Sequence, residues 1–495
     1  MKRSKKLKRR GFLGCAAGAA GGAFVPLRRA DAQETGSGGT ITLRKNIPVG
    51  ESYDVVVCGG GPSGIGAAFA ARRVGLRVLI VEAQGQLGGM STSGHVSHWL
   101  GGRTSDCTRW VVGGLFRSLA EEAAERGVAL IPVPREKSRY QPHGWHMGQL
   151  AAGIPIDPFL TAVFFDDKAA DAGIDFLLFT QAADVRVGNG RITHVIVFNK
   201  SGFTAVPAAA VIDATGDADI AFRSGCEVLK GRAEDGLMTP ATLQFHVDNV
   251  DQDTLSAYIH EHNSPRFRKK IAELRKAGEW PFPYDIFISV QLTEKGTMMI
   301  NTSRLTGVDG TDGVSVTDGM VRGREETKQL LGIMRKHFPG FADARLKTVA
   351  PLLGVRETRR IKAEFVLTVE DLVEGRDFED TIGYSAYGWD LPDPKRPSYQ
   401  PMSEKKVRKR RPVTPIPYRL MLPQPLTNLI CPGRAVSVER DVLGPLRVMA
   451  PCFAMGEAAG QAAEQVVRKK TAFDGVDIHD LREALKAHAA VVDWD

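Results

Sequence analysis

The hydrophobic pattern of the chain is clearest around a glycine-rich turn near residue 60. Tyr53–Cys58 is a β-branched apolar run of the kind found in buried strands. Residues 59–64 read GGGPSG, and residues 65–73 form a helix-favouring stretch. A second apolar run, residues 76–81, ends directly before Glu82. The pattern predicts a strand, a tight turn, a helix, a second strand and then an acid, which is how many α/β folds begin.

Hydrophobic spacing predicts further elements along the chain. Residues 111–127 and 157–172 carry apolar residues at helical spacing. Residues 176–213 alternate between apolar and polar positions and contain Asn189-Gly190, a hairpin turn signal, so they predict a small β-meander. The other expected elements are antiparallel strands at 287–292 and 297–301 and a helix at 322–337.

The composition is that of an ordinary globular protein with more than one domain. The chain has 495 residues, of which 43% are hydrophobic and 25% are charged, so a disordered chain and a single small module are both excluded. No stretch reaches the roughly 18 to 20 uncharged apolar residues that a membrane-spanning helix needs. We therefore expect no membrane span.

The formal net charge of +8 belongs to the N-terminal leader. Residues 1–32 contain nine of the 65 basic residues and only one of the 57 acidic residues. The other 463 residues therefore carry 56 basic and 56 acidic side chains. Because the rest of the chain is neutral overall, the charge gives no reason to expect a nucleic-acid partner.

Residues 1–32 resemble a twin-arginine signal peptide. A basic stretch ends in RRGFL at residues 9–13, a core of small residues continues to Val25, and Ala30-Asp31-Ala32 offers a cleavage site. The resemblance implies that the folded protein is exported, to the periplasm or beyond. That route suits a chain with a tightly held cofactor. The alternative interpretation is a disordered basic tail.

The glycine-rich turn has the G-x-G-x-x-G spacing of a dinucleotide-binding site. In such a turn Gly59 permits the tight bend, Gly61 lets the backbone approach a pyrophosphate, and Gly64 lets helix and strand pack closely. The N-terminus of the following helix offers unpaired N–H groups to the phosphates. Glu82, 23 positions after Gly59, can accept hydrogen bonds from both ribose hydroxyls.

Three dispersed segments favour FAD over NAD as the nucleotide. Residues 86–94 include Met90 and resemble the segment that passes over the flavin in the branch related to glutathione reductase. Residues 210–219 resemble the strand and glycine turn that close that domain. Residues 428–434 and 455–460 resemble its final strand and helix, whose N-terminus would face the flavin pyrimidine ring.

Together these segments resemble the FAD-dependent oxidoreductase family that contains the flavin domain of heterodisulfide reductase. The resemblance spans roughly residues 53–465, and the run around Arg356 and Arg359 is its most specific part outside the nucleotide site. The chain departs from the family where Asp390-Leu391-Pro392 replaces the frequent Asp-x-His. A catalytic role for a histidine at that position therefore cannot be transferred. The further matching segments are residues 301–304, 354–361, 416–419 and 447–452.

The resemblance implies a Rossmann-like FAD-binding domain of glutathione-reductase type, with an inserted β-meander and a mixed α+β substrate domain. After the signal peptide, residues 33–225 and 421–495 would form the FAD-binding domain, and residues 226–420 the substrate or cap domain. The cofactor-binding candidates are Gly59, Gly61, Pro62, Ser63, Gly64, Glu82, Gly88, Gly89, Met90, Val185, Thr215, Gly216, Asp217, Gly433, Arg434 and Gly456.

Two histidines, His95 and His98, follow the flavin segment within a few residues. Histidine titrates near neutrality, so either side chain could accept a proton while a hydride leaves for the flavin. We favour His95, because it follows Gly94, whose missing side chain lets the backbone approach the ring. A covalent histidyl–flavin bond and a purely structural role are the open alternatives.

Arginines are the candidates for binding an anionic group, because a guanidinium offers paired donors. Neighbouring residues on a strand point to opposite faces, so Arg359 and Arg360 cannot both face one pocket. Buried salt bridges between domains are their alternative role. The catalytic candidates are His95, His98, Arg356 and Arg359, with Arg304 as a further possible clamp. A polar and aromatic cluster could line a pocket or, as we favour, anchor a loop; it comprises Tyr140, His143, Trp145 and His146.

Cysteine and histidine spacing argues against a metal. The six cysteines form no C-x-x-C pair, and the eleven histidines include no H-E-x-x-H, so no zinc or iron–sulfur centre is expected.

No second nucleotide fingerprint follows a strand, so NAD(P)H is not expected to reduce the flavin through a dedicated domain. Cys452, just before the final helix, is expected to be structural.

The leading functional hypothesis is an exported FAD-dependent oxidoreductase that dehydrogenates a small organic substrate. Electrons would pass to an external acceptor such as a quinone, a cytochrome or oxygen. One alternative is a fumarate-reductase-like enzyme that reduces an unsaturated acid. The other is a non-catalytic electron-transfer subunit that needs a partner chain.

Overall fold

The computed structural model describes residues 43–133 and 152–494. The predicted signal peptide and the cluster from Tyr140 to His146 lie outside these described residues. The described residues from 47 onward form one compact unit, and every helix and strand named below belongs to it.

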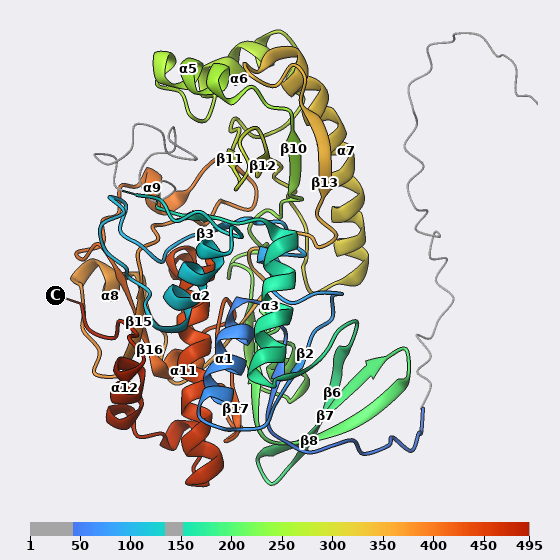
Figure 1. Ribbon diagram of the computed structural model, residues 1–495, viewed down its shortest axis with the longest axis vertical. Helices are drawn as coiled ribbons and strands as arrows, with labels where there is room; N and C mark the ends of the chain where they lie inside the picture. The colour runs from blue at the N-terminus through green and yellow to red at the C-terminus, as the bar shows by residue number, and fades with distance from the viewer. Residues whose placement is uncertain (1–42, 134–151, 495) are drawn as a thin grey trace, which may run out of the picture. The chain divides into compact units, whose positions relative to one another are not determined.

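The larger sheet combines parallel and antiparallel strands, which confirms an α/β fold with a mixed sheet (Figure 1). Its parallel part has β1 at the centre, paired with β2 on one side and with β8 on the other. Strand β5 extends this part beyond β2, and the short β17 pairs with β8. These strands are β1 (Tyr53–Cys58), β2 (Val78–Val81), β5 (Asp175–Leu177), β8 (Gly202–Asp213) and β17 (Leu429–Ile430).

The predicted β-meander is confirmed as an antiparallel extension of the same sheet. Strand β6 (Gln181–Gly188) pairs with β7 (Arg191–Asn199), and β7 pairs with β8. Asn189 and Gly190, with φ of +52° and +70°, form the turn between β6 and β7, as the sequence predicts. Because β8 is twelve residues long, its first half completes the meander and its second half joins the parallel strands.

The first and last long helices of the unit pack against each other, although they are nearly 400 residues apart. In Figure 1, α1 (Pro62–Arg73) and α11 (Met449–Arg468) lie side by side near the centre of the molecule. Gly456 allows this close approach, since a Cβ there would fall 2.0 Å from the main-chain oxygen of Ser63. Gly456, a predicted cofactor-binding residue, is thus placed at a helix–helix contact inside α11.

Two more helices complete this layer where the amphipathic pattern predicts them. They are α2 (Gly114–Glu125) and α3 (Pro158–Ala172). The start of α3 is fixed by Asp157, whose carboxylate accepts hydrogen bonds from the N–H groups of Phe159 and Leu160 at 2.8 and 2.9 Å. Gly173, with φ of +66°, ends the helix.

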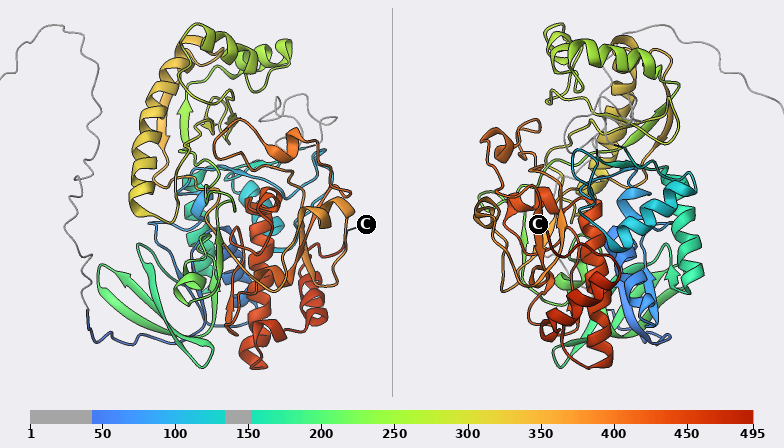
Figure 2. Two further views of the ribbon diagram at one scale, coloured as in Figure 1. Left: turned by 180° about the vertical axis from the view of Figure 1, so that it is seen from behind. Right: turned by 60° about the vertical axis from the view of Figure 1, so that its left-hand side comes forward.

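A second, smaller sheet shares a core with the helices α5, α6 and α7, and we call this part of the structure the cap (Figure 2). Its strand order is β11-β12-β10-β13, and all of its pairs are antiparallel. The predicted strands near 289 and 299 are confirmed, whereas the helix expected at 322–337 begins earlier. Asp312 accepts a hydrogen bond from Ser315 N at 2.7 Å and so caps the helix nine residues upstream. The cap elements are β10 (Phe245–Asp248), α5 (Gln252–His262), α6 (Arg268–Lys276), β11 (Ser289–Gln291), β12 (Met298–Ile300), α7 (Gly313–His337) and β13 (Arg345–Val349).

The cap has its own hydrophobic core, which extends from Phe245 to Ala344. The segment predicted as the cap, 226–420, therefore divides between two cores. Leu367, Ile382 and Ile416 pack in the large core with α1 and α11 rather than with the cap. The physical reason is that the chain returns to the large core through short paired strands once β13 has ended.

Six short strands of the described residues form three two-stranded sheets, in which β9 pairs with β14, β15 with β16, and β3 with β4. Within the described residues, no helix is long and apolar enough to cross a membrane. The remaining elements are β3 (His98–Trp99), β4 (Ile154–Pro155), α4 (Asp219–Arg223), β9 (Val228–Lys230), β14 (Arg359–Ile361), α8 (Val369–Glu374), β15 (Thr381–Ser385), α9 (Pro401–Glu404), β16 (Thr414–Pro417), α10 (Leu443–Leu446) and α12 (Ile478–Ala487).

Candidate active site

Two adjoining cavities lie at the carboxyl ends of the parallel strands. We call the first the glycine cavity, because Gly59, Gly61, Glu82 and Thr215 line it. We call the second the arginine cavity; it lies toward the cap and its wall includes Arg304, Arg356 and Arg447. The two cavities share five wall residues, so they adjoin each other; these are Met90, Val355, Arg434, Arg447 and Met449.

The glycine-rich turn forms one wall of the glycine cavity. Gly59 has φ of +105°, and a Cβ there would fall 2.4 Å from the carbonyl oxygen of Ala214, so only glycine fits. At Gly61, by contrast, a Cβ would meet only Gly89 Cα, at 3.9 Å. Gly61 precedes α1, whose N-terminus has no side-chain cap and begins with Pro62. The N-terminus of α1 therefore faces open space with backbone donors available for an anion.

Glu82 lies in the same wall at the end of β2, where the sequence predicts it. One carboxylate oxygen accepts from Gly60 N at 2.6 Å and the other from Gln84 N at 2.7 Å. Burial raises the pKa of Glu82, and these two backbone hydrogen bonds oppose that shift. The carboxylate is thus held in place beside the glycine-rich turn, with lone pairs left for a further donor.

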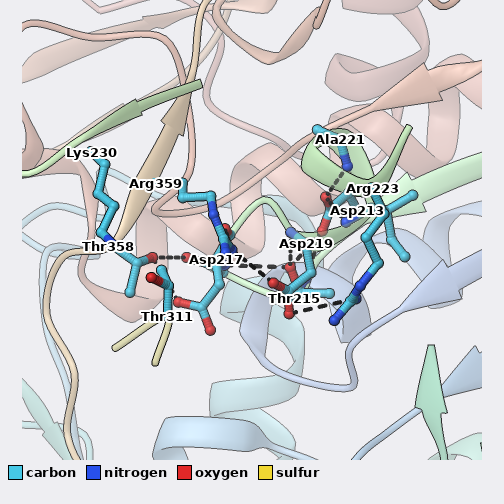
Figure 3. Close-up of polar contacts among 12 residues, drawn as sticks. Asp213, Thr215, Asp217, Asp219, Ala221, Arg223, Lys230, Thr311, Thr358 and Arg359 are labelled. Atoms are coloured by element: carbon cyan, nitrogen blue, oxygen red, sulfur yellow. Dashed lines mark hydrogen bonds and ion pairs between the residues drawn. The ribbon is translucent and has the colours of Figure 1, made fainter. Parts of the chain in front are cut away.

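The loop after β8 supplies the opposite wall, and its conformation is fixed by Asp213. Buried Asp213 accepts hydrogen bonds from Thr215 Oγ1 at 2.6 Å and from Ala221 N at 3.0 Å (Figure 3). A little further on, Asp217 accepts from Thr358 Oγ1 at 2.7 Å and from Arg434 at 2.5 Å. These contacts hold Thr215, Gly216 and Asp217 along the cavity.

The N-terminus of α11 points at the junction of the two cavities. The helix begins at Met449, six residues before the predicted Met455, and Val448 at its cap position provides no side-chain hydrogen bond. Its positive dipole end would therefore favour negative charge at the junction.

Cys452 lines the glycine cavity, and burial raises the pKa of its thiol to about 12. The thiol is thus protonated at neutral pH, which suits a structural role.

Eleven of the sixteen predicted cofactor residues line the glycine cavity. They are Gly59, Gly61, Pro62, Ser63, Glu82, Gly89, Met90, Thr215, Gly216, Asp217 and Arg434. The other five do not line either cavity: Val185 packs from β6 against the core of the sheet, and the other four are glycines with close neighbours, namely Gly64, Gly88, Gly433 and Gly456. An unfilled cradle at Gly61, an uncapped helix and a fixed acid together fit the pyrophosphate and ribose of FAD.

The arginine cavity has a volume of about 180 Å³, against about 370 Å³ for the glycine cavity. Its cap-side wall is apolar and includes Ile286, Ile288 and Met299. Its polar wall, as far as the described residues form it, carries guanidinium groups and a single carboxylate, that of Asp390. Asp390 Oδ2 accepts from Tyr387 Oη at 3.0 Å and pairs with Arg447 at 3.1 Å. Burial would raise the pKa of Asp390, but the nearby guanidinium groups, that of Arg447 first, hold it below its usual value.

The two predicted histidines occupy different environments. His98, in β3, lies in the wall of the arginine cavity, whereas His95 lies behind that wall. The ring of His95 packs against Phe159 and against His246, whose centroid is 5.0 Å away. Burial lowers the pKa of His95 to about 4, so it is neutral at pH 7. The chain turns at His95 (φ +50°), and the structure places His98 rather than the favoured His95 in the cavity wall.

The predicted arginines also separate. Arg356 lines the arginine cavity, but Arg359 does not. Arg359 instead pairs with Asp219 at 2.9 Å (Figure 3) and lies over the ring of Phe222 at 4.3 Å. Arg360 points away from Arg359, as strand geometry requires for neighbouring residues. It pairs with Glu357 at 3.2 Å. Both Arg359 and Arg360 therefore hold segments together.

The polar residues of this cavity that were not among the catalytic candidates predicted from sequence include Arg266, Tyr387 and Arg447. Arg266 comes from the cap, Tyr387 follows β15 and Arg447 precedes α11, so only the tertiary fold brings them together. Their one sequence signal is that Arg447 begins the matching segment 447–452.

Among residues 43–133 and 152–494, no group of acidic, histidine or cysteine side chains could hold a metal ion.

Comparison with known proteins shows which family this site belongs to. The model of a family described as FAD dependent oxidoreductase matches residues 54–485. The chain is 29% identical over 248 residues to a thiamine thiazole synthase of Aeropyrum pernix, covering 48% of this chain and 79% of that protein. It is 28% identical over 224 residues to digeranylgeranylglycerophospholipid reductase 2 of Methanothermobacter thermautotrophicus, covering 43% of this chain and 52% of the reductase.

Solved structures with a similar arrangement are more distant in sequence. A geranylgeranyl bacteriochlorophyll reductase-like protein from Thermoplasma acidophilum is 14% identical, with a TM-score of 0.43, covering 88% of this chain and 84% of that one. The p-nitrophenol 4-monooxygenase of Pseudomonas putida is 11% identical, with a TM-score of 0.46, covering 89% and 88%.

Proposed function

Because the chain belongs to the FAD dependent oxidoreductase family, we propose that it dehydrogenates a small organic substrate bound in the arginine cavity. FAD is the cofactor of this family, which confirms the cofactor predicted from the three dispersed segments. We infer that its domain is of the glutathione-reductase type, with the adenosine and pyrophosphate in the glycine cavity. Bound FAD would supply an acceptor for a hydride, and an external acceptor such as a quinone, a cytochrome or oxygen would then take the electrons.

The observation that carries this proposal is the shared wall of the two cavities. Met90, Val355 and Met449 line both of them, so a substrate on the cap side would lie next to the nucleotide side. The cap helices and the apolar wall would exclude water from that contact. His98 stands in the same wall and would take the proton that leaves with the hydride.

An anaerobic screen tests this function. Purified FAD-loaded protein is mixed with pools of small organic compounds, and the loss of the visible absorbance of the oxidised flavin is followed. We expect at least one pool to bleach the flavin, and a single compound to account for it. If every pool leaves the flavin oxidised, the electron-transfer subunit becomes the better interpretation.

The reverse reaction, reduction of an unsaturated acid, is the second candidate function. It is supported by the excess of guanidinium groups over carboxylates around the arginine cavity, since such groups would hold an acid. Reoxidation of the chemically reduced protein by fumarate would favour this direction. A compound that only bleaches the oxidised flavin would favour dehydrogenation.

We also propose that residues 1–32 direct export of the folded protein by the twin-arginine route. Replacing Arg9 and Arg10 together by lysine is expected to leave the protein in the cytoplasm with its leader attached. Cell fractionation measures this, and replacing Lys5 and Lys6 by arginine is the control, because it alters the basic stretch without touching the pair. Unchanged recovery of the Arg9→Lys, Arg10→Lys protein outside the cytoplasm would contradict the proposal.

A further inference from the structure

Two arginines of the arginine cavity have no carboxylate partner among the described residues. Arg304 is 7% exposed, and its NH1 group donates to neutral oxygens, those of Thr242 and Ser303 among them, at 3.3 and 2.9 Å. Arg356 is half-buried and donates to the carbonyl oxygen of Pro240 at 2.6 Å. Withdrawing a cation from water is costly unless an anion pairs with it. The arrangement therefore favours binding of an anion.

Asn301 brings the two guanidinium groups to the same place. Its main-chain oxygen accepts from Arg304 at 3.2 Å, and its side-chain oxygen accepts from Arg356 at 3.3 Å. All three residues line the arginine cavity, and neither arginine lines the glycine cavity. The pair therefore faces the substrate side rather than the pyrophosphate.

Asp390 offsets the charge of this pair only in part, because it attracts both guanidinium groups without forming an ion pair with either. Among the described residues, Asp390 is the one carboxylate in the cavity wall, and it is held by Tyr387, by Gln400 at 2.7 Å and by Arg447. Burial, and the proximity of Arg304 and Arg447, hold the pKa of Arg356 well below its usual value. The mutual repulsion that this implies would be relieved by a bound anion.

The apolar part of the cavity wall indicates what kind of anion would fit. Ile286, Ile288 and Val290 line the same cavity with apolar side chains, and Met299 adds a flexible thioether. An inorganic ion would leave that surface facing water, whereas an organic acid would cover it. The cavity thus combines a cationic end with an apolar side.

We propose that the arginine cavity binds a small organic acid, with its carboxylate between Arg304 and Arg356 and its apolar part against Ile286, Ile288 and Met299. The inference deepens the proposed function and rests on it for the identity of this cavity as the substrate site. It holds for either direction of the redox reaction. Paired guanidinium groups suit a carboxylate because each offers parallel N–H donors.

Binding is measured by calorimetry on the FAD-loaded protein, so that no turnover is needed. The probes are acetate, crotonate, succinate and benzoate, with the neutral amide of each acid as its matched control. We expect at least one acid to bind about tenfold more tightly than its amide, since hydrogen bonds to charged groups are the stronger ones. Equal binding of acids and amides, or equal binding of inorganic phosphate, would overturn the proposal.

Substitutions assign the binding to the two arginines. Arg304→Gln and Arg356→Gln should each weaken binding of that acid by about 10-fold to 100-fold, and Arg304→Lys should lose less because it keeps the charge. Arg345→Gln is the control, because Arg345 is exposed on β13 and outside the cavity. Should either glutamine variant unfold, Arg304→Lys and Arg356→Lys still decide, since unchanged affinity in both would overturn the proposal.

The outcome separates this inference from the proposed function. If an acid binds through the arginines but no compound bleaches the flavin, the binding site stands and the redox proposal fails. If a neutral compound bleaches the flavin and no acid binds, the redox function stands and the carboxylate site is wrong.

Discussion

Replacing Gly61 by valine is expected to yield a folded protein that contains no FAD. A Cβ at Gly61 would have only Gly89 Cα within 4 Å, at 3.9 Å, and the φ of −75° suits any residue, so the fold tolerates the side chain. The side chain would instead occupy the space before the N-terminus of α1, where a pyrophosphate approaches the backbone. The flavin absorbance of the purified variant, compared with its protein content, measures the loss.

A matched control separates this steric effect from general damage. Gly332→Val adds the same side chain on α7, at an exposed glycine with no atom within 4 Å of its Cβ, and should keep the full flavin content. Circular dichroism of both variants shows whether each is folded. A folded Gly61→Val protein with full flavin absorbance would refute the assignment of the glycine cavity to FAD.

Replacing His98 by asparagine is expected to slow flavin reduction by about 10² to 10⁴, the usual cost of losing a general base. His98 is the histidine in the wall of the arginine cavity, and it does not line the glycine cavity, so the variant should keep its FAD. The measurement is anaerobic stopped-flow reduction with the compound found in the screen. It gives the rate of the chemical step without the external acceptor.

His95→Asn is the matched control for that variant. Asparagine tolerates the positive φ at this position, and His95 lies behind the cavity wall with its pKa lowered to about 4. Its removal should change the reduction rate by a few-fold at most. A normal rate for His98→Asn together with a large loss for His95→Asn would reverse the assignment made from the structure.

The glycine-rich wall of the nucleotide side could be predicted from sequence because its residues are close together along the chain. The strand, turn, helix and acid from Tyr53 to Glu82 follow one another directly, so local pattern and spacing were enough. The meander was predicted for the same reason, since the Asn189-Gly190 turn marks its first hairpin. These are local signals that tertiary contacts did not override.

The substrate side could not be predicted in the same way, because distant segments build it. Arg266, Arg304 and Arg447 reach one cavity from the cap and from the loop before α11, and nothing in their spacing shows this. The sequence also could not rank His95 against His98, since the turn at His95 decides which ring faces the cavity. Likewise, Gly456 proved to be a packing glycine because α11 begins at Met449.

A crystal structure of the FAD-loaded protein tests the central claim most directly. That claim is that the flavin lies where the glycine cavity and the arginine cavity meet. We predict electron density for the flavin ring beside Met90, Val355 and Met449, with the N-terminus of α11 toward it and the arginine cavity open on its other face. Density for the ring elsewhere, or a ring with no opening to the arginine cavity, would contradict the claim.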